Sequence, residues 1–243
     1  SDLGQMPVNE IAAPVNRVLF PAFASVQAER DALRGAFLKA LQAVIAVTWP
    51  AGVGLALVAQ PAVALVLGAK WLAGAGVLAV IALFASVRSV AATGCSLLFG
   101  LGRPRAVASL AGVSFVAFIA LALPLGAHAG LVGIAQAKLA AAVITAVASL
   151  WLVVRAGICS WSDLARVTWR PAVAVAIMAA VLTGLPVPDG LSPLVSLAAL
   201  CSIGAACYGA ATLALWWASG RPEGPESLVL AALRRRWPYR SQP

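Results

Sequence analysis

Three basic side chains lie inside apolar stretches of this sequence, where a positive charge is costly. They are Arg17, Arg88 and Lys138, and Glu10 is the acid found in such a stretch. A cation in hydrocarbon needs a counter-charge, a carbonyl contact or a polar cavity, because hydrocarbon does not solvate it. Arginine binds phosphate through two parallel hydrogen bonds, and lysine binds it as a point charge. The three residues are therefore candidates for contacting an anionic substrate.

Arg88 lies near the middle of the apolar run VIALFASVRSVAATGCSLLF, residues 80–99. At the centre of a membrane helix a charge costs about 2.5–3.5 kcal/mol on insertion scales. The interface is roughly 15 Å away, too far for an arginine side chain to reach. The same run carries a stripe of small hydroxyl residues that points about 120° away from Arg88. This stripe consists of Ser86, Ser89, Thr93 and Ser96. We expect one face of the helix to pack closely and another to present the charge.

Lys138 lies about 12 Å from the outer end of its expected helix. At helical spacing it shares a face with Ala142, Thr145 and Ser149. A polar face on a membrane helix is expected to turn toward other helices. A purely structural contact that positions the helices is the alternative interpretation for Lys138, as it is for Arg88 and Arg17.

Arg17 belongs to residues 3–26, a weaker hydrophobic segment that three prolines interrupt. Glu10 lies seven residues earlier, which places both charges on one helical face, although Pro14 lies between them. Glu10 is therefore a candidate partner for Arg17. The cations of the apolar stretches still outnumber their acids, which favours a counter-charge that arrives with a ligand, and a lipid-linked pyrophosphate fits both the charge and the medium.

The composition indicates that these residues are positioned by membrane helices. Of the 243 residues, 62% are hydrophobic and 10% are charged, and the mean hydropathy is +0.97. A soluble fold of this size cannot bury so much apolar surface. The sequence therefore predicts an all-α integral membrane protein with six complete transmembrane helices and a partial, proline-interrupted N-terminal one. The six segments are residues 38–59, 75–99, 106–126, 130–153, 171–187 and 191–218.

This division predicts three regions: a partial transmembrane segment at 1–26, a six-helix lobe at 27–218 and a basic tail at 219–243. Two stretches, 25–41 and 226–237, have the mixed apolar and basic pattern of interfacial helices. The alternative is that they are charged ends of membrane helices. The fifth segment is expected to begin at Pro171.

The basic residues outside the spans alternate between the two sides of the membrane. Thirteen of the 17 Lys and Arg residues fall on one side and one, Lys70, on the other. The positive-inside rule then places the rich side, with the C-terminus, in the cytoplasm. Topology accounts for the net charge of +9, so no nucleic-acid partner is needed. We expect a multi-pass protein of the bacterial inner membrane.

Three stretches carry a resemblance to a known family. They are IAAPVNRVLFPAFASVQAERDALRGAFLKAL (11–41), TWPAGVGLALVAQPAVALVLGAKW (48–71) and LLFGLGRPRA (97–106). They resemble the C-terminal half of polysaccharide-repeat-unit flippases of the exopolysaccharide and colanic-acid type, in the multidrug/oligosaccharidyl-lipid/polysaccharide exporter superfamily. The resemblance covers residues 1–155. It implies the C-terminal lobe of a two-lobe transporter, with the chain beginning inside the eighth span and an N-terminal lobe supplied by the same or another chain.

The resemblance implies alternating access, in which a polyprenyl-pyrophosphate-linked oligosaccharide crosses the inner membrane for polysaccharide biosynthesis. Membrane lipids and the lipid-linked oligosaccharide are the expected partners, and no cofactor or metal is expected. A multidrug cation exporter of the same superfamily is one alternative, although such a protein would be expected to use carboxylates within the membrane. A non-transporting scaffold subunit is another, and it predicts that Arg88→Leu is tolerated.

A membrane enzyme, such as a glycosyl or acyl transferase, requires an acid–base group at a membrane face. The candidates for such a group are His128, Asp163 and Asp189, which stand apart from one another and show no motif. The four cysteines contain no CxxC pair, so neither a disulfide framework nor a zinc site is suggested. We therefore expect no catalytic residues.

Overall fold

The computed structural model describes residues 30–185 and 193–218, and within these ranges the regular structure is entirely helical. The segments predicted at 1–26 and 219–243, and the basic stretch 226–237, lie outside the described residues. The elements in chain order are α2 (Arg30–Leu57), α3 (Ala59–Val66), the short 3-10 helix η1 (Ala69–Gly74), α4 (Ala75–Gly100), α5 (Pro104–Arg155), α6 (Trp161–Gly184) and α7 (Pro193–Ala218).

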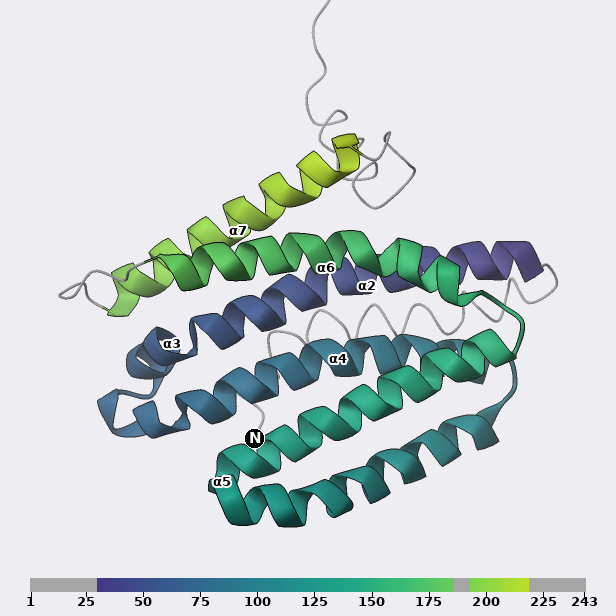
Figure 1. Ribbon diagram of the computed structural model, residues 1–243, viewed down its shortest axis with the longest axis horizontal. Coiled ribbons are helices and arrows are strands. Elements are labelled where there is room, and N and C mark those ends of the chain that lie inside the picture. Colours follow the sequence, from purple (N-terminus) through teal and green to yellow (C-terminus); the bar gives the residue numbers. More distant parts are fainter. Residues whose placement is uncertain (1–29, 186–192, 219–243) are drawn as a thin grey trace, which may run out of the picture.

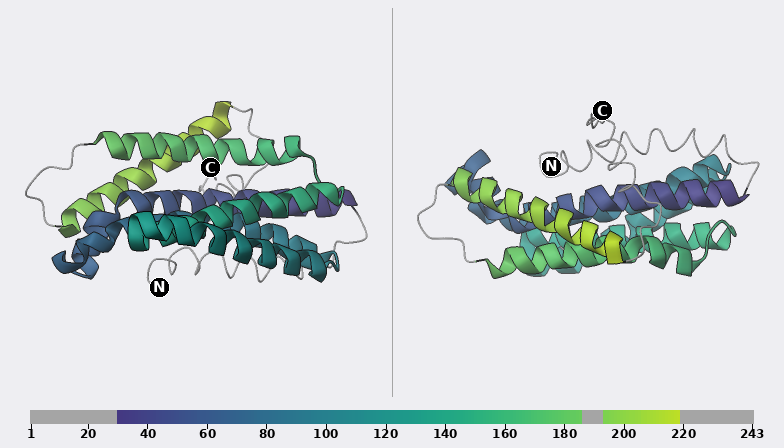
Figure 2. Two further views of the ribbon diagram at one scale, coloured as in Figure 1. Left: turned by 60° about the horizontal axis from the view of Figure 1, so that its bottom comes forward. Right: turned by 90° about the horizontal axis from the view of Figure 1, so that it is seen from above.

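The long helices lie side by side in the order α7, α6, α2, α4 and α5 (Figure 1), and each contacts the next. Figure 2 shows that they follow one long direction, with α7 crossing α6 obliquely. Five of these helices are long and apolar enough to cross a membrane. Because their exposed surfaces are largely apolar side chains, the surrounding medium must be lipid. The chain is a multi-pass membrane protein with the expected all-α architecture.

Helix α5 combines two of the predicted spans, 106–126 and 130–153. Its regular dihedral angles are interrupted at Gly130, where φ is +56° and ψ is −133°, and the chain folds back on itself there (Figure 1). A positive φ of this kind is accessible to glycine at little cost. At Gly133 a Cβ atom would collide with the carbonyl oxygen of Leu125, which shows how closely the two arms approach. The arms, residues 104–129 and 131–155, are each long enough to span a bilayer.

The prediction that the fifth span begins at Pro171 is wrong, because α6 begins ten residues earlier, at Trp161. The sequence Ser160-Trp-Ser-Asp163 forms a capping box: the Asp163 backbone N–H donates to Ser160 Oγ, and the Ser160 N–H donates to Asp163 Oδ2 at 2.9 Å. These contacts satisfy backbone donors that the first turn of a helix leaves unpaired. A proline is tolerated inside a membrane helix, so Pro171 does not end this one.

The same carboxylate joins α6 to α2. Arg34 Nη2 donates to Asp163 Oδ1 at 2.6 Å, and the Asp163 side chain is only 6% exposed. Asp163 is therefore the structural partner of an arginine that lies 129 positions away in the sequence. The enzyme interpretation treated Asp163 as an isolated loop acid, whereas this carboxylate is fully occupied by structural hydrogen bonds.

Arg166 and Arg170 lie in helix α6. The sequence had placed both in the loop between the spans predicted at 130–153 and 171–187. One of them, Arg170, is buried and its Nη2 donates to the backbone carbonyl of Leu215 on α7 at 3.2 Å. Arg170 is roughly 14 Å from the start of α6 along the axis. Among the described residues, Arg170 thus lies inside an apolar helix, as Arg88 and Lys138 do.

The stretch 25–41 also differs from an interfacial helix. From Arg30 it is continuous with the span as α2, and its apolar side chains Leu33, Phe37 and Leu41 are buried in the bundle core. This agrees with the alternative of a charged end of a membrane helix. Between α2 and α4, the connection at 60–74 contains the additional short helices α3 and η1.

The hydroxyl stripe of α4 packs against α2, as expected. Thr48 Oγ1 of α2 and Ser89 Oγ of α4 lie 2.8 Å apart, and Ser86 Oγ donates to the Thr48 carbonyl oxygen at 2.9 Å. All three side chains are buried. Gly52 of α2 allows this approach, because a Cβ atom there would lie 2.7 Å from the Ala82 carbonyl oxygen and would collide with Ser86. Small residues at this contact let the two backbones come close.

We predict that Gly52→Ala destabilises the protein by about 1–3 kcal/mol, since an added methyl group must push α2 and α4 apart. The matched control is Gly35→Ala in the same helix, where nothing lies within 4 Å of the new Cβ atom. Alanine favours helix over glycine, so this control should be neutral or stabilising. Thermal unfolding of the purified protein measures both, and equal melting temperatures for the two variants would contradict the close contact.

Candidate functional site

Arg88 lies close to the midpoint of α4, and its side chain is exposed on the surface of the described chain. The hydroxyl stripe on the other side of α4 faces α2, so the two faces predicted for this helix are both present. Within the part of the chain that the structure describes, Arg88 has neither a hydrogen-bonding partner nor an ion pair. No described residue uses the capacity of its guanidinium group for a bidentate contact.

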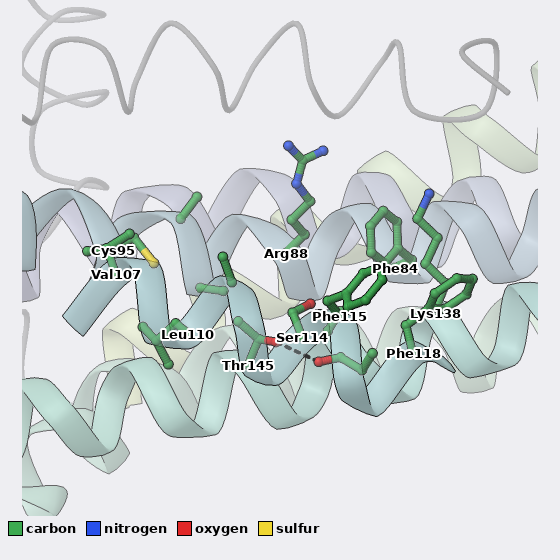
Figure 3. A pocket seen from close by; sticks show the side chains of 15 residues that line it. Phe84, Arg88, Cys95, Val107, Leu110, Ser114, Phe115, Phe118, Lys138 and Thr145 are labelled. Carbon is green, nitrogen blue, oxygen red and sulfur yellow. Dashed lines mark hydrogen bonds between the residues drawn. The ribbon is translucent and has the colours of Figure 1, made fainter. Parts of the chain in front are cut away.

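Arg88 lines a cavity of about 480 Å³ between α4 and the two arms of α5. Lys138, on the second arm, lines the same cavity, so the structure brings together two of the three cations selected from the sequence. Figure 3 shows both charged groups on one side of the cavity, pointing the same way. The described lining residues are Phe84, Arg88, Ala91, Ala92, Cys95, Val107, Leu110, Ala111, Ser114, Phe115, Phe118, Lys138, Ala141, Ala142 and Thr145.

Lys138 is held over an aromatic ring of α4. Its Nζ atom lies 5.1 Å from the centroid of Phe84, within the range of a cation–π contact. The Phe84 ring is buried, whereas the Lys138 side chain is exposed. The electron-rich face of the ring offsets part of the cost of placing an ammonium group near hydrocarbon. It does so without neutralising the charge, which stays available to an anion.

The face that Lys138 shares with other residues turns toward the bundle along most of its length. Ser149 is completely buried, and it packs so closely against Gly94 of α4 that a Cβ atom there would lie 2.9 Å from Ser149 Oγ. Ala142 is buried and lines the cavity, and Thr145 Oγ1 donates to the carbonyl oxygen of Ala141 at 2.7 Å. This face is thus buried in the bundle at Ser149 and opens into the cavity at Lys138.

The chemistry of the cavity is that of an anion site with apolar walls. The described residues that line it include two cations and no acid. Like charges on adjacent helices repel one another, and the repulsion is larger where the surroundings are apolar than in water. An anion bound between Arg88 and Lys138 would relieve that repulsion and form charge-assisted hydrogen bonds. No acid–base or nucleophilic arrangement accompanies the two cations in the described lining.

Arg17 and its candidate partner Glu10 lie outside the described residues. The sequence reasoning did not select Phe84, which supports Lys138. A signal for it was present, because Phe84 and Arg88 are four residues apart and share a helical face. The capping box at Ser160 and Asp163 also had a signal, a serine followed three residues later by an acid before an apolar stretch.

Comparison with known proteins identifies relatives for much of the chain. The family model described as "Polysaccharide biosynthesis protein" matches residues 1–93. The chain is 30% identical over 150 residues to the lipopolysaccharide biosynthesis protein WzxC of Escherichia coli (strain K12), a match that covers 62% of this chain and 30% of that protein. It is 34% identical over 98 residues to the teichuronic acid biosynthesis protein TuaB of Bacillus subtilis (strain 168), a match that covers 40% of this chain and 20% of that protein.

An uncharacterized membrane protein in the cps region of Klebsiella pneumoniae is 35% identical over 85 residues, covering 35% of this chain and 18% of that protein. The matched regions thus span less than a third of each of these relatives. Among solved structures, the lipid II flippase MurJ in an inward closed conformation has a TM-score of 0.69 at 16% identity. The match covers 87% of this chain and 44% of MurJ, and it shows a shared fold. These findings confirm that the chain resembles polysaccharide biosynthesis proteins over part of their length. Its fold is shared with part of a solved flippase.

We predict that Phe84→Leu and Lys138→Met are energetically coupled by about 0.5–1 kcal/mol, because each removes one half of the cation–π contact. The matched control is Phe118→Leu, which alters another phenylalanine of the cavity and should be additive with Lys138→Met. Unfolding of the purified single and double variants gives the coupling free energies. Additivity of Phe84→Leu with Lys138→Met would show that the ring does not support the ammonium group.

Proposed function

We propose that this chain forms one lobe of a flippase for polyprenyl-pyrophosphate-linked oligosaccharide repeat units, in the biosynthesis of a bacterial polysaccharide. The observation that carries the proposal is the meeting of Arg88 and Lys138 at one apolar-walled cavity inside a membrane protein. A ligand for such a site must be anionic and must be accommodated among membrane helices. A lipid-linked pyrophosphate has both properties, and it needs transport rather than covalent chemistry.

The two cations are the proposed contacts for the pyrophosphate. A guanidinium group matches two phosphate oxygens at once, and the ammonium of Lys138 adds a second positive charge from another helix. Arg17 is a further proposed contact, on the ground of its charge in an apolar segment. The relatives named for lipopolysaccharide and teichuronic acid biosynthesis support a glycan precursor as the cargo.

The transport mechanism that we propose is alternating access between two lobes. The match of this chain covers 44% of MurJ, and the side chains of Arg88 and Lys138 are exposed on the surface of this chain. A second lobe, in the same or another chain, would face them and complete the wall of the cavity. The cations would then be reached from one side of the membrane at a time.

The proposed location is the bacterial inner membrane, with the basic end of the bundle and the C-terminus in the cytoplasm. The start of α2 and both ends of α5 lie at one end of the bundle (Figure 1). These helix ends carry Arg34, Arg105 and Arg155. The positive-inside rule places such an end in the cytoplasm. A precursor made on that side would enter the cavity there and leave on the opposite side.

A multidrug cation exporter is less well supported, because a cavity lined by two positive charges repels a cationic drug. A non-transporting scaffold subunit requires that the charge of Arg88 be dispensable. Deleting the gene distinguishes the flippase from the exporter. The flippase proposal expects loss of surface polysaccharide with lipid-linked units stranded on the cytoplasmic leaflet, whereas intact polysaccharide with altered sensitivity to cationic drugs supports the exporter.

We predict that Arg88→Ala in the complete transporter abolishes export while membrane insertion stays intact, since the anion loses its bidentate partner. Arg88→Lys should retain part of the activity if charge suffices, and little if the paired hydrogen bonds are needed. Arg105→Ala is the matched control, because Arg105 is exposed at the turn between α4 and α5. Export is scored as surface polysaccharide, and insertion by immunoblotting of membranes. Normal export by Arg88→Ala would contradict the ligand-binding role.

A further inference from the structure

Helix α2 contains a proline, Pro50, in its second half. Proline has no N–H, so the carbonyl oxygen of Ala46, four residues earlier, cannot receive the usual hydrogen bond of an α-helix. The hydroxyl group of Tyr208 on α7 donates to this oxygen at 2.8 Å. We propose that Pro50 is a hinge of α2 and that the Tyr208 hydroxyl is a latch that holds the hinge in the conformation of this structure. This device belongs to the lobe itself, whatever cargo the transporter carries.

The Ala46 carbonyl oxygen needs a donor, because a backbone polar group without a partner is strongly unfavourable inside a membrane. A proline is tolerated in a membrane helix where a neighbouring group supplies the missing partner. Here the donor comes from another helix, 162 positions away in the sequence. The hydrogen bond can therefore open and close while the hydrogen bonds within both helices stay intact.

The residues that follow Pro50 make α2 easy to bend. Gly52 and Gly54 lie two and four positions further on, and glycine weakens a helix relative to alanine. Sharp bends in helices are found mostly at prolines. The helix ends soon afterwards at Leu57, and α3 begins at Ala59. A bend is therefore expected to concentrate in residues 50–54.

The contact between α2 and α4 supplies the pivot for such a bend. Thr48 precedes the proline and is hydrogen-bonded to Ser86 and Ser89. Gly52 follows it and lies close to the backbone of α4. Both contacts hold the hinge point against α4. Bending then moves residues 53–57 and α3, while α4 keeps its place and presents Arg88 as before.

A cavity beside the hinge provides the space for this movement. It has a volume of about 630 Å³ and lies between α2, α6 and α7. Protein interiors are otherwise close-packed, so a helix moves only where its neighbours leave room. The described lining carries no charged residue that the movement would displace. The α2 residues that line the cavity are Ala46, Val47, Pro50, Ala51, Gly54 and Leu55.

The test is hydrogen–deuterium exchange of the complete protein in lipid nanodiscs, followed by mass spectrometry. Tyr208→Phe removes the donor and keeps the ring. We expect exchange of the backbone amides of residues 51–66 to rise about fivefold, the equivalent of about 1 kcal/mol for one hydrogen bond. Exchange of residues 31–45 should stay unchanged. A rise spread evenly along α2, or no rise, would overturn the hinge.

Thr183→Val is the matched control, because it removes a hydroxyl group that donates to carbonyl oxygens of its own helix, α6. This variant should leave exchange of residues 51–66 at the wild-type level. A rise equal to that of Tyr208→Phe would show that any lost hydroxyl group loosens the bundle, and it would overturn the latch.

Pro50→Ala tests whether the Ala46 carbonyl is the point at which Tyr208 acts. It restores an N–H for that carbonyl, so adding Tyr208→Phe should change the exchange by less than about twofold. An equal rise in both backgrounds would overturn the latch. If Pro50→Ala does not fold, 4-aminophenylalanine at position 208 replaces this test, because it keeps a donor. Exchange near the wild-type level would support the latch, and exchange like that of Tyr208→Phe would overturn it.

Ala205→Phe tests the direction of the movement, because Ala205 lines the cavity from α7. Added to Tyr208→Phe, it should return the exchange of residues 51–66 close to the wild-type level, since α2 then has no space to move into. Fast exchange that persists in the double variant would show that α2 does not bend into the cavity. These measurements need no cargo, so the hinge and the proposed function can fail independently of each other.

Discussion

Helices in a lipid bilayer gain little from burying apolar side chains against each other, because lipid is equally apolar. Close packing and hydrogen bonds between helices must supply the specificity, and the contact of α2 with α4 supplies both. Gly52 has no side chain, so the two helices can approach closely where they cross. Thr48, Ser86 and Ser89 join the helices through buried hydroxyl groups. This contact fixes the rotation of α4 about its own axis. Every other feature of the cavity depends on that rotation.

The rotation decides where Arg88 lies. Because the hydroxyl stripe faces α2, the arginine must leave α4 on another side, where the two arms of α5 form the walls of the cavity. The fold-back at Gly130 returns the second arm to α4 and carries Lys138 to the same cavity. The buried Phe84 ring then lies beneath the ammonium group. Packing of uncharged residues thus brings two positive charges from different helices to one cavity.

The two arginines well inside membrane helices illustrate two solutions to the same problem. Arg170 is buried and donates to the Leu215 carbonyl oxygen, so its charge is stabilised by the protein and joins α6 to α7. Arg88 is exposed at a cavity and has no such contact among the residues that the structure describes. Arg170 thus has the purely structural role that was the alternative interpretation for Arg88, Lys138 and Arg17. For Arg88 a ligand contact remains our proposal.

The sequence alone determined the membrane class, the existence of the long described helices and the two faces of α4, because these follow from composition and from the 3.6-residue period of a single helix. It also selected Arg88 and Lys138, since a charge inside an apolar run is visible without any partner.

Only the tertiary structure decided which residues meet. Arg34 and Asp163 pair across 129 positions, and Lys138 meets Phe84 through the turn at Gly130. Local periodicity does not encode such contacts, since they depend on how whole helices pack. The start of α6 was missed for a related reason: its capping box outweighs the helix-ending tendency of Pro171, and in a membrane neighbouring groups satisfy the backbone that proline leaves unpaired.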